Sequence, residues 1–224
     1  MPDVQELLHQ IQRELAPIEA RLRDHPYLLA LEQGRVPRER LSVFVGEQHT
    51  TIESDLRSLA TLVARSDSPL SRRLFLSILP GEDTAFSALQ TLALALGLNQ
   101  GWLQTYEPTP EAQAYSHYVA WLAHYASPAE MAGALAVNFP AWASNCARMG
   151  AALRQRYSLS AEATDFFSLF SGASPSQFEE GVKRVIDDGL GREVKVDQVR
   201  RAARLLQSYE LMFWDGIHRA SMEA

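Results

Sequence analysis

Residues 194–221 read VKVDQVRRAARLLQSYELMFWDGIHRAS, and this stretch decides the fold class. Its apolar residues recur every three or four positions, the spacing that places side chains on one face of an α-helix. One acidic residue, Glu210, lies within that apolar face. The pattern therefore predicts a long helix with a carboxyl group among its core-facing side chains. The face consists of Val199, Ala203, Leu206, Glu210, Phe213 and Ile217.

The same period continues through most of the chain, and strict alternation of apolar and polar residues is absent. Breaks are expected at proline and glycine, notably at Pro80-Gly81. No linker, repeat or low-complexity segment divides the sequence, so we predict an all-α, multi-helix bundle that forms a single domain over residues 1–224. The expected helices are 2–24, 38–66, 69–79, 83–97, 109–125, 128–157, 160–171, 175–189 and 194–221.

The composition limits the possible function classes. The formal net charge is -6 and the isoelectric point about 5.5, and no basic run occurs, so we expect no affinity for nucleic acid. Cys146 is the only cysteine, which excludes a disulfide within the chain and fits a reducing compartment. A secretory leader and an apolar run long enough to cross a membrane are both absent. We expect a cytoplasmic protein that binds a small molecule and no membrane.

Two further predicted helices carry a polar residue within an apolar face. These residues are Gln48 in segment 38–66 and Asn138 in segment 128–157. Either residue alone is more often a core amide bonded to its neighbours than a ligand contact. Together with Glu210 they indicate a polar pocket shared by three helices. Burial would raise the pKa of Glu210 and suit it to general acid/base chemistry, but a purely structural carboxyl remains an equal alternative.

Acidic residues and histidines form no clear metal-binding motif. Glu6 and His9 make the only Glu-x-x-His pair, and they lie near a chain end. Asp215 and His218 can share one helix face, where a contact between neighbouring turns explains them as well as a metal does. A Gly-rich phosphate loop and a nucleophile elbow are also missing. We therefore predict no metal site and no cofactor.

Two stretches resemble the TenA family, also called thiaminase II. Residues 25–41, HPYLLALEQGRVPRERL, are similar to the family's His-Pro-Phe segment and to the glycine and Leu-Pro turn that follow it. Residues 208–215, SYELMFWD, resemble the family's C-terminal Tyr-Glu-x-x-Phe-Trp signature. The resemblance spans the domain and implies a heme-oxygenase-like helical bundle. Because such proteins commonly assemble into oligomers, we expect a homo-oligomer, either a dimer or a tetramer.

The resemblance also implies an activity and its residues. Members of the family hydrolyse thiamine or its aminopyrimidine breakdown product, and their catalytic acid/base falls on Glu210. The family's nucleophilic Cys falls near Asn138, and an amide cannot form the covalent adduct that a thiolate forms. Other pocket positions of the family fall on helices 38–66, 109–125 and 160–171. The residues that we expect to contact the ligand are Gln48, Thr51, Tyr115, Asn138, Phe170 and Glu47.

Three functions remain open at this point. The first is binding of an aminopyrimidine or thiamine-related heterocycle, with acid/base hydrolysis by Glu210 and no Cys nucleophile. The second is a ligand-binding or regulatory relative without catalysis. The third is a metal-dependent oxidase, because the fold is shared with the oxidase PqqC and with the di-iron chlamydial death-domain-associating protein. Its candidate ligands are Glu82, Glu47, Glu210 and His218, although Phe86 and Leu89 occupy the register of a required histidine.

Overall fold

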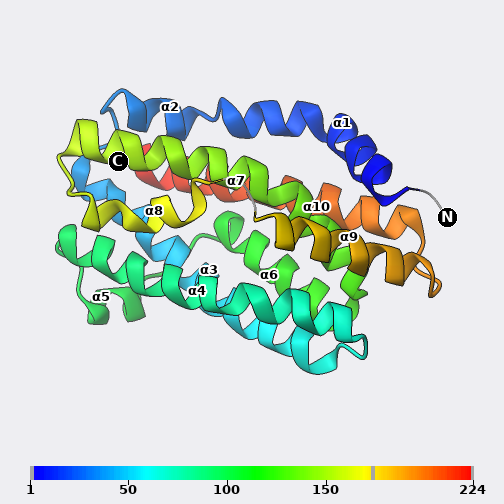
Figure 1. Cartoon of the computed structure of the whole chain (residues 1–224). Coiled ribbons are helices and arrows are strands. Elements are labelled where there is room, and N and C mark those ends of the chain that lie inside the picture. Colours follow the sequence, from blue (N-terminus) through cyan, green and yellow to red (C-terminus); the bar gives the residue numbers. More distant parts are fainter. Residues whose placement is uncertain (1–2, 173–174, 223–224) are drawn as a thin grey trace.

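The computed structural model describes residues 3–172 and 175–222, and it contains helices and no strand within these ranges (Figure 1). The all-α prediction is therefore confirmed. The α-helices are α1 (Val4–Arg23), α2 (Pro26–Glu32), α3 (Leu41–Arg65), α4 (Pro69–Ala95), α5 (Gln100–Thr105), α6 (Pro110–Tyr125), α7 (Pro128–Tyr157), α8 (Asp165–Phe170), α9 (Ser176–Leu190) and α10 (Val196–Met222). Short 3-10 turns, η1 (Arg38–Arg40) and η2 (Glu162–Thr164), precede α3 and α8.

The break expected at Pro80-Gly81 is wrong, because α4 continues through both residues. Proline removes one helical hydrogen bond and frees the carbonyl of the residue four positions earlier, here Leu76. Both Pro80 and Leu76 are exposed, so water can bind this carbonyl, while Leu74, Phe75 and the apolar residues after the proline hold the helix on the core. Tertiary packing thus overrides the local breaker.

Other differences concern short elements. Helices α2 and α5 were not expected, since seven and six residues are too few to show a clear period. Segment 160–171 is divided into η2 and α8. The first helix ends as expected, but the expected start at Pro2 lies outside the described residues. Segment 128–157 matches α7 at both ends, where Pro128 takes the first position and Ser127 and Glu130 form a reciprocal capping box.

Helices α7 and α10 cross at the centre of the bundle, and Figure 1 shows α1 and α2 along one edge with α3 and α4 along the opposite edge. A glycine permits the close approach of the central pair. A Cβ atom added at Gly133 of α7 would lie 2.4 Å from Val199 Cγ1 of α10, so a larger residue would separate the helices. This approach brings Asn138 of α7 within reach of Glu210 of α10.

The two stretches that carry the family resemblance meet in space. His25 caps α2 by accepting the Tyr27 backbone N–H at Nδ1, and its Nε2 lies 3.1 Å from Asp215 Oδ1 of α10. Because Nδ1 accepts, Nε2 carries the proton and donates it to the carboxylate. The Tyr27 ring lies against the Trp214 ring at 6.1 Å. The segment 25–41 therefore supports the part of α10 that presents Glu210.

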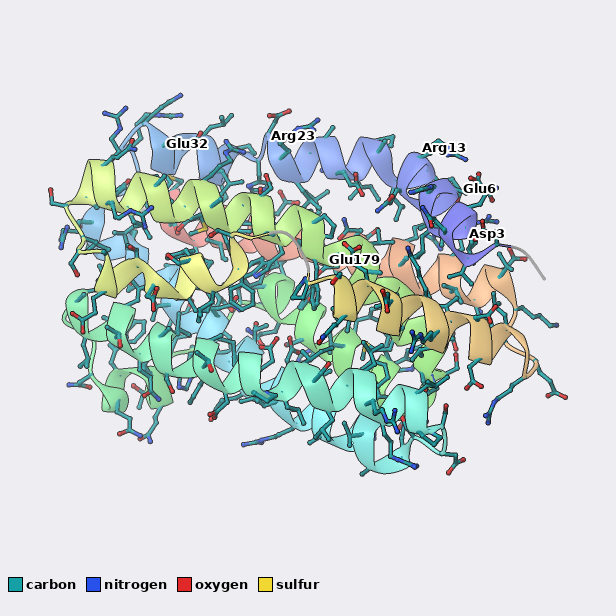
Figure 2. The ribbon with its side chains drawn as sticks, in the orientation of Figure 1. Asp3, Glu6, Arg13, Arg23, Glu32 and Glu179 are labelled. Atoms are coloured by element: carbon teal, nitrogen blue, oxygen red, sulfur yellow. The ribbon has the colours of Figure 1, made fainter. Side chains whose placement is uncertain are left out.

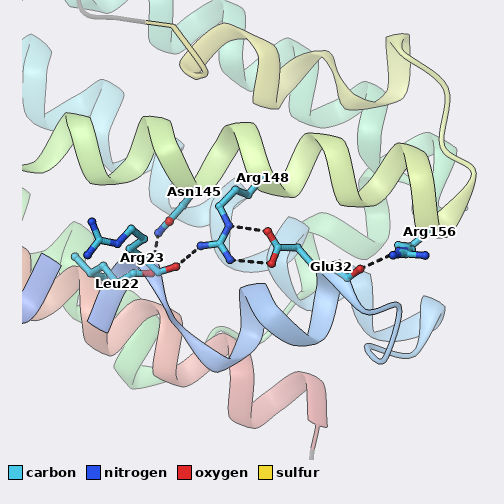
Figure 3. A network of polar contacts seen from close by, with 6 residues as sticks. All are labelled: Leu22, Arg23, Glu32, Asn145, Arg148 and Arg156. Atoms are coloured by element: carbon cyan, nitrogen blue, oxygen red, sulfur yellow. Dashed lines mark hydrogen bonds and ion pairs between the residues drawn. The ribbon is translucent and has the colours of Figure 1, made fainter. Parts of the chain in front are cut away.

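A polar cluster ties the α1–α2 edge to α7 (Figure 3). The Arg148 guanidinium donates to both carboxylate oxygens of Glu32, at 2.6 and 2.8 Å, and also to the Arg23 carbonyl oxygen. Asn145 donates to the Leu22 carbonyl oxygen at 3.4 Å, and Arg156 donates to the Glu32 carbonyl oxygen at 2.9 Å. Two-point arginine–carboxylate pairing is the stronger form of such contacts.

Within the described residues, no helix combines the length and apolar character needed to cross a bilayer.

Replacing Arg148 with alanine should reduce the free energy of unfolding by about 1–2 kcal/mol, because it leaves the Arg23 carbonyl and the Glu32 carboxylate without their donor. Urea unfolding measures the change. Arg13→Ala is the matched control, since the Arg13–Glu6 pair at the outer end of the molecule is exposed by 65% and 52% and should contribute little to stability (Figure 2). Equal losses in both variants would contradict the structural role of the cluster.

Candidate functional site

A cavity lies where α3, α4, α6, α7, α8 and α10 meet, and its enclosed part, here called the inner cavity, has a volume of about 60 Å³. Polar groups lie on several of its walls, and aromatic side chains close one end. Five of the six side chains expected to contact a ligand, together with Glu210, are brought to this one place. Its lining is Gln48, Thr51, Asp55, Leu59, Ile78, Glu82, Tyr115, Val119, Leu135, Asn138, Phe139, Trp142, Phe170, Glu210 and Phe213.

Glu210 is held in one orientation by two donors. Its Oε2 accepts a hydrogen bond from Asn138 Nδ2 at 2.5 Å, and its Oε1 accepts one from Trp214 Nε1 at 3.2 Å. The residue is only 2% exposed. Both donors favour the charged carboxylate, but burial outweighs them and raises the pKa of Glu210 to about 8. At neutral pH the group is therefore mostly a neutral acid, as general acid catalysis requires.

Asn138 connects Glu210 to the opposite wall. Its Oδ1 accepts the Tyr115 hydroxyl at 3.1 Å, and its Nδ2 also donates to Gln207 Oε1 at 2.9 Å. The amide is thus fixed by three helices, α6, α7 and α10. Burial and the nearby carboxyl groups raise the pKa of Tyr115 well above its usual value, so its hydroxyl stays protonated.

Helix α3 presents a row of acceptors without partners. Gln48 Oε1, Thr51 Oγ1 and Asp55 Oδ1 are buried and have no hydrogen-bond partner among the described residues. The three lie at spacings of three and four residues, so they share one face of the helix. Buried polar atoms without partners are rare, and at a cavity wall they point to a ligand or water that supplies the donors.

Asp55 was missed by the sequence analysis. The stripe that identified Gln48 continues by one and two turns to Thr51 and Asp55, so helical spacing alone could have found it. Burial, with a smaller contribution from the negative charge of Glu82, raises the pKa of Asp55 well above its usual value. The Asp55 carboxyl is therefore a second acid in the inner cavity.

Glu82 supplies a third carboxyl group from α4. The helix predicted over 83–97 would begin just after Glu82, but because α4 is continuous Glu82 lies in the middle of the helix and faces the inner cavity. Burial raises the pKa of Glu82 to about 7. Carboxyl groups from α3, α4 and α10 thus surround Tyr115, and each of them contributes to raising the pKa of its hydroxyl.

Glu47 does not line the inner cavity, in contrast to its expected role as a ligand contact. Its Oε1 accepts the Thr109 backbone N–H at 2.7 Å and the Tyr106 hydroxyl at 3.1 Å, while its Oε2 accepts Gln113 Nε2 at 2.9 Å. These donors lie in and around the start of α6, on the other side of α3. A fully bonded, buried carboxylate in this position holds α6 against α3.

Cys146 also lies away from the inner cavity. It is fully buried in the apolar core two turns beyond Asn138, and burial raises the pKa of its thiol well above the usual value. A buried neutral thiol is a poor nucleophile. The cavity position next to Glu210 is taken by Asn138 instead.

An aromatic wall separates the inner cavity from a larger surface cleft. Trp142 and Phe170 pack edge to face, with ring centroids 5.9 Å apart, and Trp142 lies 6.2 Å from Phe213 in the same manner. The outer cleft has a volume of about 830 Å³ and lies between α4, α7, α8 and α9. Ile78, Glu82, Phe139, Trp142 and Phe170 line both spaces, so they form the boundary between them.

Among the described residues, no group of three or more His, Cys, Asp and Glu side chains has the arrangement to hold a metal ion. The oxidase hypothesis needs a histidine where the chain has Phe86 or Leu89. Phe86 packs on the His49 ring at 5.1 Å, and Leu89 is part of the apolar core. These positions therefore supply packing and no ligand.

The sequence matches the TENA/THI-4/PQQC family over residues 12–220. Among solved structures, a TenA homologue from P. horikoshii OT3 shares 20% identity and a TM-score of 0.76, covering 96% of this chain and 99% of the other. A domain of unknown function with a heme-oxygenase-like fold from Shewanella denitrificans shares 13% identity at a TM-score of 0.76, covering 95% and 92%. A Sulfolobus solfataricus protein described as TenA-like shares 12% identity at 0.70, covering 99% and 98%. No curated protein matches the chain.

The raised pKa of Glu210 predicts a specific pH dependence of stability. A carboxyl whose pKa is about 8 in the folded state and 4.5 when unfolded contributes fully below pH 4.5, and this contribution is lost as the pH rises to 8. The loss is on the order of 5 kcal/mol at most. Glu210→Gln should therefore be increasingly stabilising relative to the wild type between pH 5 and pH 9, as measured by urea unfolding. A constant difference between the two proteins would show that Glu210 titrates normally.

Proposed function

The chain belongs to the TENA/THI-4/PQQC family, and we propose that it binds an aminopyrimidine or another thiamine-related heterocycle in the inner cavity and hydrolyses it with Glu210 as the acid. The observation that carries the proposal is the pairing of a buried, neutral Glu210 with unpartnered acceptors on the facing wall. An amino-substituted ring offers N–H donors to those acceptors. Its leaving nitrogen needs a proton, which Glu210 can supply.

In the proposed reaction, the bond between a carbon atom attached to the ligand's ring and the leaving nitrogen breaks. A bond from that carbon to a water oxygen forms. Glu210 transfers its proton to the nitrogen as it leaves. The water loses one proton, which returns to the Glu210 carboxylate, so that the acid is restored. Positioned proton transfer of this kind contributes roughly 10²–10⁴-fold to a rate.

Two features support direct attack by water over a covalent intermediate. Cys146 is a buried neutral thiol in the core, and Asn138 is bonded to Tyr115, Gln207 and Glu210. An amide fixed in this way orients the acid and has no nucleophilic character. We assign Asn138 as a positioning residue, because it acts through Glu210.

The dimensions favour a ligand that reaches into both spaces. A cavity that binds benzene has a volume of roughly 150 Å³, more than the 60 Å³ of the inner cavity. The polar edge of the ring would enter between α3 and α10, and its remaining atoms would extend past Trp142 and Phe170 into the outer cleft. These two aromatic residues would stack on the ring or against its substituent.

A non-catalytic ligand-binding protein is the second candidate, and the Asn138 position favours it. The Asn138 amide occupies the place where the family resemblance predicts a nucleophile. The same cavity could therefore bind the ligand without hydrolysing it. Saturable binding of an aminopyrimidine with no release of hydroxymethylpyrimidine would identify this case.

A homo-oligomer in the cytoplasm completes the proposal. An aromatic surface on α6 and α10 supports self-association: Trp121 and Tyr125 are 48% and 76% exposed, and the Tyr118 ring stacks on Trp121 at 5.7 Å. The surface reaches α10 through Tyr209, whose ring centroid lies 5.0 Å from that of Tyr118. Exposed aromatic side chains are enriched at protein–protein interfaces.

Hydrolysis should depend on Glu210 and not on Cys146. We expect Glu210→Gln to reduce hydroxymethylpyrimidine release from aminopyrimidine or thiamine by at least about 100-fold, since the amide has no proton to transfer. Cys146→Ala should retain turnover, because the thiol does not line the inner cavity. Chromatographic detection of the product tests both variants. Loss of activity in Cys146→Ala with an intact fold would contradict the direct attack by water.

Light scattering coupled to size-exclusion chromatography should show a dimer or tetramer for the wild type and a smaller species for Trp121→Glu. The substitution places a charge in the centre of the exposed aromatic surface, where burial against a second copy would be costly. Trp121 is 48% exposed, so its replacement should leave the core intact. The helix content of the variant, measured by circular dichroism, should therefore equal that of the wild type. A monomeric wild type would refute the assembly.

A further inference from the structure

We propose that Asp55 and Glu82 form a cation subsite, facing Glu210 across the inner cavity, that selects ligands bearing a basic amine. The subsite deepens the proposed function, on which it rests, because it defines the chemical class of the ligand. Its residues come from α3 and α4, which pack along each other on the side of the bundle opposite α1 and α2 (Figure 1). The sequence did not indicate Asp55, and it indicated Glu82 only as a candidate metal ligand.

The first argument is the charge balance of the inner cavity. Three carboxyl groups, from Asp55, Glu82 and Glu210, line it, and no Arg, Lys or His is among the described residues of its lining. A buried carboxylate is stable only when a cation or several donors accompany it. Glu210 has two donors, but Asp55 Oδ1 has no partner in the described part of the chain. The lining supplies no cation to an ionised Asp55, so a ligand that binds the charged form must bring the positive charge itself.

The second argument is the arrangement of donors and acceptors. Gln48 Oε1 and Thr51 Oγ1 stand beside Asp55 without partners among residues 3–172 and 175–222. An ammonium group carries three N–H donors, which matches a row of acceptors on a single helix face better than a hydroxyl with one donor does. The row lies on α3 and Glu210 lies on α10, so the two walls of the inner cavity contact different parts of the ligand.

Without a ligand, the subsite holds protons. Burial and the nearby Glu82 raise the pKa of Asp55, and burial raises the pKa of Glu82 to about 7. The other titratable groups of the inner cavity are Tyr115 on α6 and Glu210 on α10, while α7 and α8 contribute only non-titratable side chains. An incoming cation favours the ionised carboxylates and lowers their pKa values, so amine binding must release protons. This release is independent of any turnover.

Glu82 of the subsite also lies at the boundary between the inner cavity and the outer cleft. Glu82 lines both the inner cavity and the outer cleft, so a ligand that reaches from one space into the other meets its carboxyl. Attraction of a cationic nitrogen at this point guides the amine end inward first. The uncharged end of the ligand then remains near Trp142 and Phe170.

The test compares benzylamine with benzyl alcohol, which differ only in an ammonium and a hydroxyl group. Titration calorimetry at pH 7 in the presence of a chelator should show benzylamine binding about tenfold more tightly or better. The binding enthalpy of benzylamine should vary with the ionisation enthalpy of the buffer, which reports proton release. Asp55→Asn and Glu82→Gln should each remove most of the preference for the amine and leave the affinity for benzyl alcohol unchanged.

Two controls separate the subsite from its surroundings. Glu53→Gln removes an exposed carboxylate from the outer face of the same helix and should keep the preference. Glu210→Gln should also keep it, because the proposal assigns the amine to Asp55 and Glu82 on the other wall of the inner cavity. Both alterations at the subsite remove a buried ionisable group, so the variants should fold, and circular dichroism with the retained binding of benzyl alcohol verifies this.

Equal affinity of the wild type for the two probes, no binding of either, or a preference that persists in both Asp55→Asn and Glu82→Gln would overturn the subsite. A preference that disappears only in Glu210→Gln would overturn it as well, by assigning the amine to the other end of the inner cavity. Failure of the proposed hydrolysis is a different result. In that case aminopyrimidines are not turned over, while the preference for benzylamine and its proton release remain.

Discussion

The hydrogen bond from Asn138 to Glu210 connects the packing of α7 against α10 with the chemistry of the inner cavity. It exists because Gly133 lets the two helices approach, and because Trp214 holds the other carboxyl oxygen. His25, Tyr27 and Asp215 in turn hold the α10 segment around Trp214. One buried carboxyl therefore connects residues from both ends of the chain, and the surrounding helices are arranged to exclude water from it.

The family relationship explains the fold, and the particular residues of this chain suggest its chemistry. Membership in the TENA/THI-4/PQQC family and structural neighbours below 25% identity establish the helical fold. The cavity residues point to a variation in chemistry, since Asn138 stands beside the acid and the single cysteine lies in the apolar core. Buried acids without partners, such as Asp55, reduce stability, and such local conflicts with the rules of packing are typical of functional sites.

Periodicity predicted the helices and several of the inward polar residues because both depend on spacing along one helix. Glu210, Gln48 and Asn138 were found in this way. Properties that depend on contacts between helices could not be predicted from the sequence. The continuity of α4 through Pro80 follows from packing on both sides of the proline, and that continuity directs Glu82 toward the cavity. Glu47 lies next to Gln48 in sequence, yet only the position of α6 decides that it is bonded to Tyr106, Thr109 and Gln113.

The central claim is that Glu210 is a neutral acid in the inner cavity at neutral pH, and infrared spectroscopy tests it most directly. The difference spectrum between the wild type and Glu210→Gln isolates the carbonyl band of this one carboxyl group. We predict a protonated carboxylic acid band at pH 7 that is replaced by carboxylate bands with a midpoint near pH 8. A difference spectrum that contains only carboxylate bands at pH 7 would contradict the account, because an ionised Glu210 has no proton to give to a leaving group.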